Sequence, residues 1–144
     1  MDGISDTQAA YIAGIIDGEG AIGIYTITYP HRKFLRLTFQ VSMSHEPTIS
    51  CIAKSLKLKY YTYFGTDKPK HQITLASMGR IKIILERLLP YLITKKEQAK
   101  IAIDYIDSRQ KRMYLSNDNR QYNDFERECY GKLKRLNSSA SEHA

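Results

Sequence analysis

The hydrophobic residues of this chain recur with two periods, and each period predicts one kind of element. A spacing of three and four residues, typical of amphipathic helices, covers three segments: 49–56, 81–88 and 99–106. An alternation of apolar and polar residues, or a short aromatic run, is typical of strands and covers four segments: 21–28, 35–42, 60–64 and 72–76. With an apolar helix before the first strand, the predicted order is α-β-β-α-β-β-α-α, and a last helix is expected over 122–136.

This order predicts an α+β fold in which helices cover one face of an antiparallel sheet. The other face is expected to be polar, because the residues that alternate with the apolar ones are hydrophilic: Arg36, Thr38, Gln40, Gln72 and Thr74. We expect a β-bulge near 26–28, where the alternation is lost, and a basic loop over 29–33. Residues 1–115 are predicted to form the core domain, and 116–144 a helical extension that is frayed from 138.

Basic residues are concentrated in the middle of the chain. The net charge is +7, and the segment 21–85 carries ten lysines and arginines against two acids. Such an excess is typical of nucleic-acid-binding surfaces, and a solubilising surface is the alternative. Polar side chains on a sheet can read base edges in the major groove, while loop cations contact phosphates. The residues expected to contact DNA are Tyr25, Arg32, Lys33, Arg36, Thr38, Gln40, Lys68, Lys70, Gln72 and Thr74.

The first helix is predicted to begin at a capping box and to end at two acids. Ser5 and Gln8 have the spacing of the box, in which each side chain bonds the backbone of the other residue. Near the other end, Asp17 and Glu19 are separated by one glycine and followed by another, and glycine is a common helix terminator. The helix therefore carries both carboxylates to its C-terminal end.

Small residues recur every four positions along the same helix, at Ala10, Gly14 and Gly18. Residues with this spacing line one helix face, and a face without bulky side chains lets a second helix approach closely. The partner helix either belongs to the same domain or is the identical helix of a second copy. In the second case, the expected interface residues are Ala10, Ala13, Gly14 and Asp17.

The segment Ile12–Gly20, with the sequence IAGIIDGEG, resembles the LAGLIDADG motif of the homing endonucleases. It differs from that motif by conservative changes. Leu37–Val41 is similar to the second strand of this family, and Leu89–Leu92 leading into Lys95–Ala99 is similar to its helix junction. The resemblance covers roughly Ser5–Arg109 and implies the αββαββα-type fold of the family, with a DNA-binding sheet.

The resemblance implies an intron-encoded, site-specific endonuclease that makes a staggered break in a long double-stranded DNA target. The implied cofactor is Mg²⁺, which Mn²⁺ is expected to replace. Glu19 and the carbonyl of Gly18 match the metal ligands of the family, whereas the first acid of the motif, Asp17, more often settles the helix end. The expected catalytic residues are Glu19, Lys95 and Gln40.

One chain contains a single copy of the motif, so cutting both strands requires two chains. A homodimer packs the same surface against itself, and its two-fold axis predicts a pseudo-palindromic DNA target. Two copies of Glu19 would then meet near that axis, one for each strand. The homodimer of this chain is therefore expected to be the active unit.

One position departs from the family. Many single-motif members have a glutamine or another polar residue, which orders water in the active site, where this chain has Met43. Ser42, Ser44 and His45 are the alternative candidates for ordering this water, and the sequence does not choose among them. Two other functions therefore stay open beside cleavage: an RNA-binding maturase that assists intron splicing, and a DNA-binding regulator that does not cut.

Other classes of function find no support in the sequence. The two cysteines and four histidines lack the spacing of metal ligands. The first residues are polar, so no signal peptide is expected. The apolar run of the first helix is shorter than the ~20 residues that span a bilayer, so no membrane partner is expected. We expect an intracellular protein, in a bacterial or phage-infected cytoplasm or in an organelle.

Overall fold

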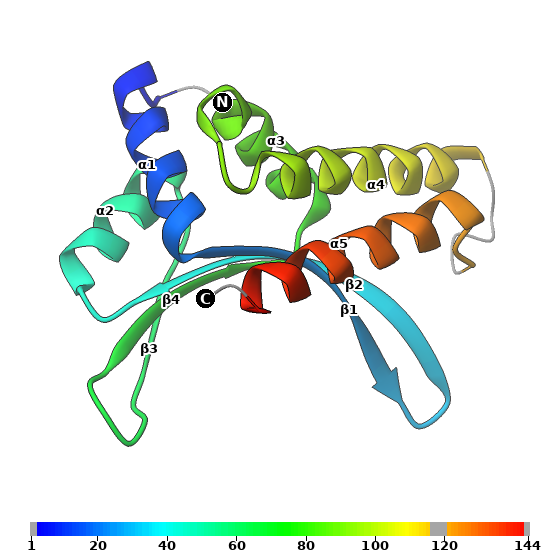
Figure 1. Ribbon diagram of the computed structural model, residues 1–144, viewed down its shortest axis with the longest axis horizontal. Helices are drawn as coiled ribbons and strands as arrows, with labels where there is room; N and C mark the ends of the chain where they lie inside the picture. The colour runs from blue at the N-terminus through cyan, green and yellow to red at the C-terminus, as the bar shows by residue number, and fades with distance from the viewer. Residues whose placement is uncertain (1–2, 116–120, 143–144) are drawn as a thin grey trace.

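The computed structural model describes residues 3–115 and 121–142 as an α+β fold, as predicted. The strands form one antiparallel sheet in the order β1-β2-β4-β3: β1 (Gly20–Tyr29), β2 (Arg32–Met43), β3 (Tyr61–Tyr63) and β4 (Lys70–Leu75). The helices are α1 (Asp6–Glu19), α2 (Glu46–Leu56), α3 (Met78–Leu88), the 3₁₀ turn η1 (Leu89–Tyr91), α4 (Lys96–Leu115) and α5 (Asp124–Glu142). Helices α1 to α4 lie above an arched sheet, α5 runs across it, and the two hairpins extend from the sheet in diverging directions (Figure 1).

Helix α1 begins at the predicted capping box. The Gln8 amide donates to the Ser5 hydroxyl at 3.1 Å, and the Ser5 amide donates to the Gln8 side chain at 2.8 Å. At the other end, Gly20 donates its N–H to the Ile16 carbonyl. A Cβ atom on Gly20 would lie only 2.8 Å from that carbonyl oxygen, so the passage from α1 into β1 needs glycine.

The β1–β2 pairing runs without interruption from Gly20↔Val41 to Tyr29↔Arg32. The expected bulge near 26–28 is therefore wrong, and the expected loop over 29–33 shrinks to the two-residue turn at 30–31. The alternation is lost there because this end of the hairpin is open to solvent on both faces: Thr26 and Thr28 are exposed. Strand β4 pairs with β2 only from Phe39 to Met43, so the part of β2 before Phe39 pairs with β1 alone among the described strands.

The core lies between the sheet and the helices, and the apolar periods predicted it well. Every apolar position expected to face inward from α2 and α3 is buried: Ile49, Ile52, Ala53, Leu56, Ile81, Ile84, Leu85 and Leu88. The sheet contributes alternate residues of β1, β2 and β4 to the same cluster: Ile22, Ile24, Leu37, Phe39, Val41, Ile73 and Leu75. Leu35, expected on this face, is half-buried. Within the described ranges, no helix has the length and hydropathy of a membrane span.

The last two helices differ in their bounds from the prediction. Helix α4 continues to Leu115, beyond the expected end near 109, and α5 begins at Asp124 and stays helical to Glu142. A second capping box explains the start of α5: the Glu126 amide donates to the Asn123 side chain at 2.8 Å, and the Asn123 amide donates to the Glu126 carboxylate at 3.3 Å. Of the expected extension, residues 116–120 and 143–144 lie outside the described part of the chain.

Candidate functional site

The polar face of the sheet forms as expected, because directly opposed residues of paired strands share a face. Across β1, β2 and β4, the register aligns Tyr25 with Arg36 and Gln40 with Thr74. Thr38 lies between Arg36 and Gln40 on the same face, with two-residue spacing. The structure therefore brings eight of the predicted DNA contacts onto one surface: Tyr25, Arg32, Arg36, Thr38, Gln40, Lys70, Gln72 and Thr74.

A glycine makes room for the aromatic residue of this face. The Tyr25 hydroxyl would lie 2.6 Å from a Cβ atom on Gly23, so its ring lies over the backbone at Gly23, where no side chain can fit. Gly23 is buried as a result, while Tyr25 remains about half exposed. The sequence pattern alone did not assign a role to Gly23.

The outer end of the β1–β2 hairpin carries a cationic cluster that sequence reasoning found only in part. The guanidinium carbons of Arg32 and Arg36 lie 5.2 and 5.5 Å from the ring centre of Phe34, and Arg32 also lies 5.8 Å from the ring of Tyr29. Such contacts hold a cation while leaving its donors accessible. Phe34 was missed, although its place between two arginines at alternate positions is the signal that could have found it.

Three predicted lysines have different positions. Lys70 shares the polar face with Gln72, two residues along β4, and Lys68 is exposed in the preceding turn. Lys33 is opposed to Thr28, so its side chain leaves β2 on the face opposite to Arg36. The expected place of Lys33 in a DNA-facing loop is therefore corrected: it lies within β2 and not on the polar face.

Asp17 joins the end of α1 to the beginning of α4. Its carboxylate accepts hydrogen bonds from the backbone amides of Ile93 and Lys95, at 2.9 and 3.0 Å. In return, the Lys95 ammonium donates to the Asp17 carbonyl at 2.9 Å. These bonds agree with the expected role of Asp17 in settling the helix end. They also bind Lys95 to Asp17, which precedes Glu19 by two positions in α1.

Glu19 differs from Asp17 in having an open carboxylate. It is exposed, and among residues 3–115 and 121–142 it has no hydrogen bond or ion pair. It lies in the last turn of α1, which contains no basic residue, so it adds negative charge to the negative end of the helix dipole. Gln40 is nearby on the polar face, opposed to Ala21. Glu19, Lys95 and Gln40 therefore gather around the junction of α1 and β1.

Met43 does not take the place of a polar active-site residue. It is half-buried and packs against the hydrophobic core, opposed to His71 of β4. Its thioether is also a poor hydrogen-bond partner for water. Ser44 and His45 are exposed beyond the end of β2, and Ser42 is half-buried on the polar face.

The small-residue face of α1 is open to solvent. Ala10, Gly14 and Gly18 are exposed, and no atom lies within 4 Å of a Cβ built on either glycine. Ala13 is different: it is fully buried in the core of its own chain, on the stripe of α1 that packs against the sheet. Its expected place in a dimer interface is therefore wrong, because it has no surface to offer a partner.

No family model matches the sequence, and no curated protein matches it either. Solved structures do match the fold. The archaeal intron-encoded homing endonuclease I-Vdi141I, complexed with DNA, aligns with a TM-score of 0.73 over 91% of this chain and 84% of that chain, at 14% identity. The homing endonuclease I-CvuI, in complex with an uncleaved DNA target in the presence of Mg, aligns with a TM-score of 0.62 over 90% of this chain and 96% of that chain, at 21% identity.

The LAGLIDADG homing endonuclease I-GzeII, in complex with its DNA target, aligns with a TM-score of 0.64 at 18% identity. The match covers 89% of this chain and 43% of that chain. Similarity at these identities establishes the fold alone. The fold is that of the LAGLIDADG homing endonucleases, as the resemblance of Ile12–Gly20 implied.

Proposed function

From the premise that this chain has the fold of the LAGLIDADG homing endonucleases, we propose that it is a site-specific DNA endonuclease. It binds a long double-stranded target as a homodimer and makes a staggered break in both strands. The observation that carries this proposal is the open carboxylate of Glu19 at the end of α1, with Lys95 bonded to Asp17 in the same helix turn and the polar face of the sheet continuing from it.

The residues at this junction fit a hard divalent cation. The Glu19 carboxylate and the Gly18 carbonyl are oxygen donors, and Mg²⁺ prefers oxygen, taking one or two protein carboxylates and keeping several waters. No group of three or more potential ligands occurs in the described part of one chain, so phosphate oxygens of the DNA would complete the coordination. When bound, Mg²⁺, or Mn²⁺ in its place, would supply charge neutralisation at the scissile phosphate.

The chain's own residues would perform the remaining tasks. Lys95 places a fixed positive charge beside the phosphate, because Asp17 orients both its backbone and its ammonium. Gln40 offers an amide that can orient the attacking water or pair with an adenine edge. The polar face lies in the major groove, and the hairpin cations Arg32 and Lys68 contact phosphates.

Dimerisation follows from the need for two cutting sites. Ala10, Gly14 and Gly18 leave an open surface on α1 that an identical helix can approach closely. The lengths of the neighbours support this assembly. The chain accounts for 96% of I-CvuI but only 43% of I-GzeII, so the same unit occurs in chains of about this length and in chains more than twice as long.

The position of Met43 favours a second candidate function, which does not involve cleavage. Because it packs into the core where related enzymes have a polar residue, the solvent network for cleavage differs here. A non-cleaving DNA regulator, or a maturase that binds intron RNA, would retain the basic face without that network.

A randomised duplex library separates these functions. The chain is incubated with the library with and without Mg²⁺ or Mn²⁺, and bound and cleaved molecules are sequenced. We expect a selected pseudo-palindromic sequence that is cut only with the metal ion. Selective binding without cutting in either metal would overturn the endonuclease and favour the regulator, and preference for structured intron RNA over duplex DNA would favour the maturase.

Base-reading and phosphate-contacting residues are distinguishable on the selected target. Arg36→Ala is expected to cost about 1–3 kcal/mol of binding free energy and to relax specificity at particular base pairs. Lys68→Ala is expected to weaken all sequences alike and to reduce the slope of log K against log salt by about one. Lys100→Ala, an exposed site on α4, serves as the control and should change neither quantity. Equal loss of specificity in both hairpin variants would contradict the assignment.

A further inference from the structure

The outer half of the β1–β2 hairpin is a two-stranded ribbon. Strand β4 pairs with β2 only from Phe39 to Met43, so residues of β2 before Phe39 have β1 as their only ladder partner among the described strands. Two-stranded ribbons are marginally stable in water on their own. The same ribbon carries Tyr25, Arg32 and Arg36, so its orientation decides where these side chains meet a ligand.

Tyr122 occupies the place of the missing third strand. Its hydroxyl accepts a hydrogen bond from the Leu35 amide at 2.8 Å and donates one to the Leu35 carbonyl at 3.3 Å. Leu35 is opposed to Thr26 of β1, and its N–H and C=O point away from that strand, toward the open edge. One side-chain hydroxyl therefore satisfies both backbone groups that a neighbouring strand would have paired.

A buried network fixes Tyr122 in turn. The Arg109 guanidinium lies over its ring at 4.4 Å from the centre and contacts the Glu126 carboxylate at 3.4 Å. Glu126 is fully buried and also binds Arg112 and Ser108, each at 2.6 Å. The hydroxyl that holds the ribbon thus belongs to the rigid junction of α4 and α5.

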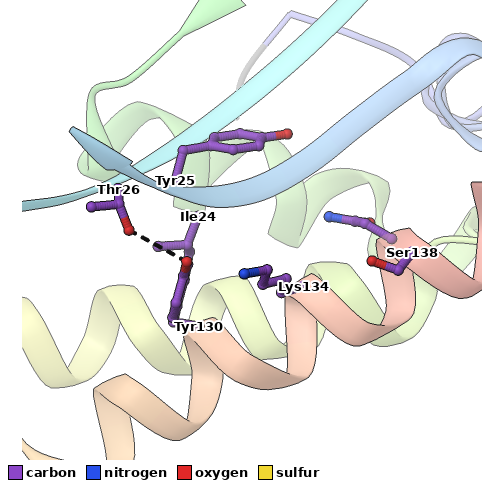
Figure 2. Close-up of a pocket in the computed structure, with 7 residues that line it drawn as sticks. Ile24, Tyr25, Thr26, Tyr130, Lys134 and Ser138 are labelled. Carbon is purple, nitrogen blue, oxygen red and sulfur yellow. Dashed lines mark hydrogen bonds between the residues drawn. The ribbon is translucent and has the colours of Figure 1, made fainter. Parts of the chain in front are cut away.

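Helix α5 continues from this junction to the opposite edge of the ribbon. The Tyr130 hydroxyl accepts a hydrogen bond from the Thr26 side chain at 3.3 Å, and Figure 2 shows this contact below β1. About two turns further on, the Asn137 side-chain amide donates to the Ile22 carbonyl at 3.1 Å. Helix α5 and its entry segment therefore hold β2 at Leu35 and β1 at Thr26 and Ile22, as a strap across the ribbon.

We infer that Tyr122 is a positioning residue for base recognition, which sets the angle of the β1–β2 ribbon through its two hydrogen bonds to Leu35. This inference rests on the proposed function. Tyr25 lies five residues along β1 from Gly20, which follows Glu19, a separation of roughly 17 Å at about 3.3 Å per residue. Tyr25 and its opposed Arg36 therefore read base pairs far from the cutting centre, whereas Gln40 and Thr74 read base pairs close to it. Specific base contacts need hydrogen-bond geometry, so a ribbon that swings loses the outer contacts first.

The first test measures the ribbon itself. Tyr122→Phe removes only the hydroxyl and should speed amide hydrogen exchange at Leu35 by about tenfold, the effect of one lost hydrogen bond, with the Phe39 amide unchanged. Tyr60→Phe is the matched control, because it removes a hydroxyl bond of the same 2.8 Å length, to Glu46, at the other hairpin. Unchanged exchange at Leu35 in Tyr122→Phe would overturn the inference.

The second test measures recognition with the randomised duplex library. Tyr122→Phe should lose sequence preference at the outer base pairs by several-fold and keep it at the inner ones. Tyr130→Phe removes the hydrogen bond to Thr26 at the other edge of the ribbon. It should reduce sequence preference at the same outer base pairs, but by less than Tyr122→Phe. Tyr60→Phe should leave these outer positions unchanged.

The outcomes separate this inference from the proposed function. If the wild type selects a sequence and Tyr122→Phe selects the same one with the same preference, only the positioning role falls. A uniform loss of affinity at all base pairs would also overturn it, because that result describes general destabilisation. If the wild type selects no duplex sequence, the proposed function falls, and base positioning falls with it.

Discussion

Helices α1 and α5 begin in the same way and use their glutamates in opposite ways. Each opens with a capping box, Ser5 with Gln8 in α1 and Asn123 with Glu126 in α5. Glu126 is fully buried and bonded by Arg109 and Arg112. Glu19 is exposed at the other end of its helix, and no residue in the described part of the chain pairs with it.

The two carboxylates differ in where their bonding partners come from. Glu126 finds its partners within the folded chain, because Arg109 and Arg112 of α4 bind its carboxylate. This ion pair stabilises the packing of α5 on α4. Folding leaves the Glu19 carboxylate without a partner among the described residues. The neighbouring face of α1, at Gly14 and Gly18, is also exposed to solvent. An acid and a surface that a monomer leaves unsatisfied are the features expected of a site that is completed by a cation, by DNA and by a second chain.

Replacing Glu19 should have the largest effect on activity. Glu19→Gln keeps the size of the side chain but removes the charge that would hold the metal ion. We expect cleavage of the selected target to fall by about 10³-fold or more, since the lost stabilisation is several kcal/mol. Binding of the target and thermal unfolding should stay close to those of the wild type.

Gel-based cleavage assays and binding titrations on the same duplex measure the two effects separately. Glu97→Gln is the matched control, because Glu97 is an exposed acid two residues from Lys95 and should leave cleavage nearly unchanged. Cutting at the wild-type rate by Glu19→Gln would remove Glu19 from the mechanism.

Replacing Glu126 should reverse that pattern. Glu126→Gln leaves two arginines near a buried neutral group, and breaking a buried ion pair typically costs about 3–5 kcal/mol. We expect the free energy of unfolding to fall by about this amount. Chemical denaturation measures it, with Glu128→Gln as the control, because Glu128 pairs with Lys132 on the exposed side of the same helix. Exposed pairs contribute about 0–1 kcal/mol, so similar losses in the two variants would contradict the distinction.

The contrast also explains how much of the molecule was predictable from sequence. Glu19 was singled out because the motif Ile12–Gly20, which carries the resemblance, is one continuous segment: an apolar helix that ends in two acids and two glycines. The network of Glu126 was not found, because Arg109 and Arg112 approach it from another helix across a connection. The sequence contained one usable signal, the capping-box spacing of Asn123 and Glu126, which would have placed the start of α5 correctly.

Two site residues were misplaced for reasons of geometry. Ala13 was grouped with the small residues of α1, although it stands one turn from Ala9 and next to Ile12 on the buried stripe. The helical period itself would have separated it from Ala10 and Gly14. Lys33 was predicted in a loop because Pro30 and the charged residues after it suggest a long turn, whereas β2 begins already at Arg32 and keeps the alternation of 35–42.

The open face of α1 provides a third way to test the contrast. Gly14→Ala and Gly14→Leu both fit the isolated chain, since nothing lies within 4 Å of the added Cβ. Leaving glycine in a helix interior costs about 1 kcal/mol relative to alanine, so Gly14→Ala should raise the unfolding free energy. Gly14→Leu should weaken dimer assembly on DNA by about 1–3 kcal/mol through overpacking.

Sedimentation on the target duplex measures the assembly, and denaturation of the dilute chain measures the stability. Gly131→Ala in α5 is the control: its Cβ meets the flexible Arg135 side chain at 3.3 Å, so the helix can adjust without affecting assembly. A Gly14→Leu chain that assembles and cuts like the wild type would show that this face is not the interface.

The smallest expected effect concerns the two cysteines, Cys51 on α2 and Cys129 on α5. Burial raises the pKa of the Cys129 thiol to about 11, so only about one molecule in 10³ is the reactive thiolate at pH 8. Cys51 is exposed. A thiol reagent should therefore label Cys51 first and Cys129 much more slowly. Because deprotonation is favoured as the pH rises toward 11, labelling of Cys129 should accelerate between pH 8 and 10.

Glu126→Gln should sharpen this difference between the helices. Loosening the α4–α5 junction exposes Cys129 and should speed its labelling several-fold, while labelling of Cys51 stays constant; mass spectrometry of the labelled chain distinguishes the two sites. Glu128→Gln should leave both rates unchanged. Faster labelling of Cys51 and Cys129 together would indicate global unfolding, and the closed state of α5 would then not depend on the Glu126 network in particular.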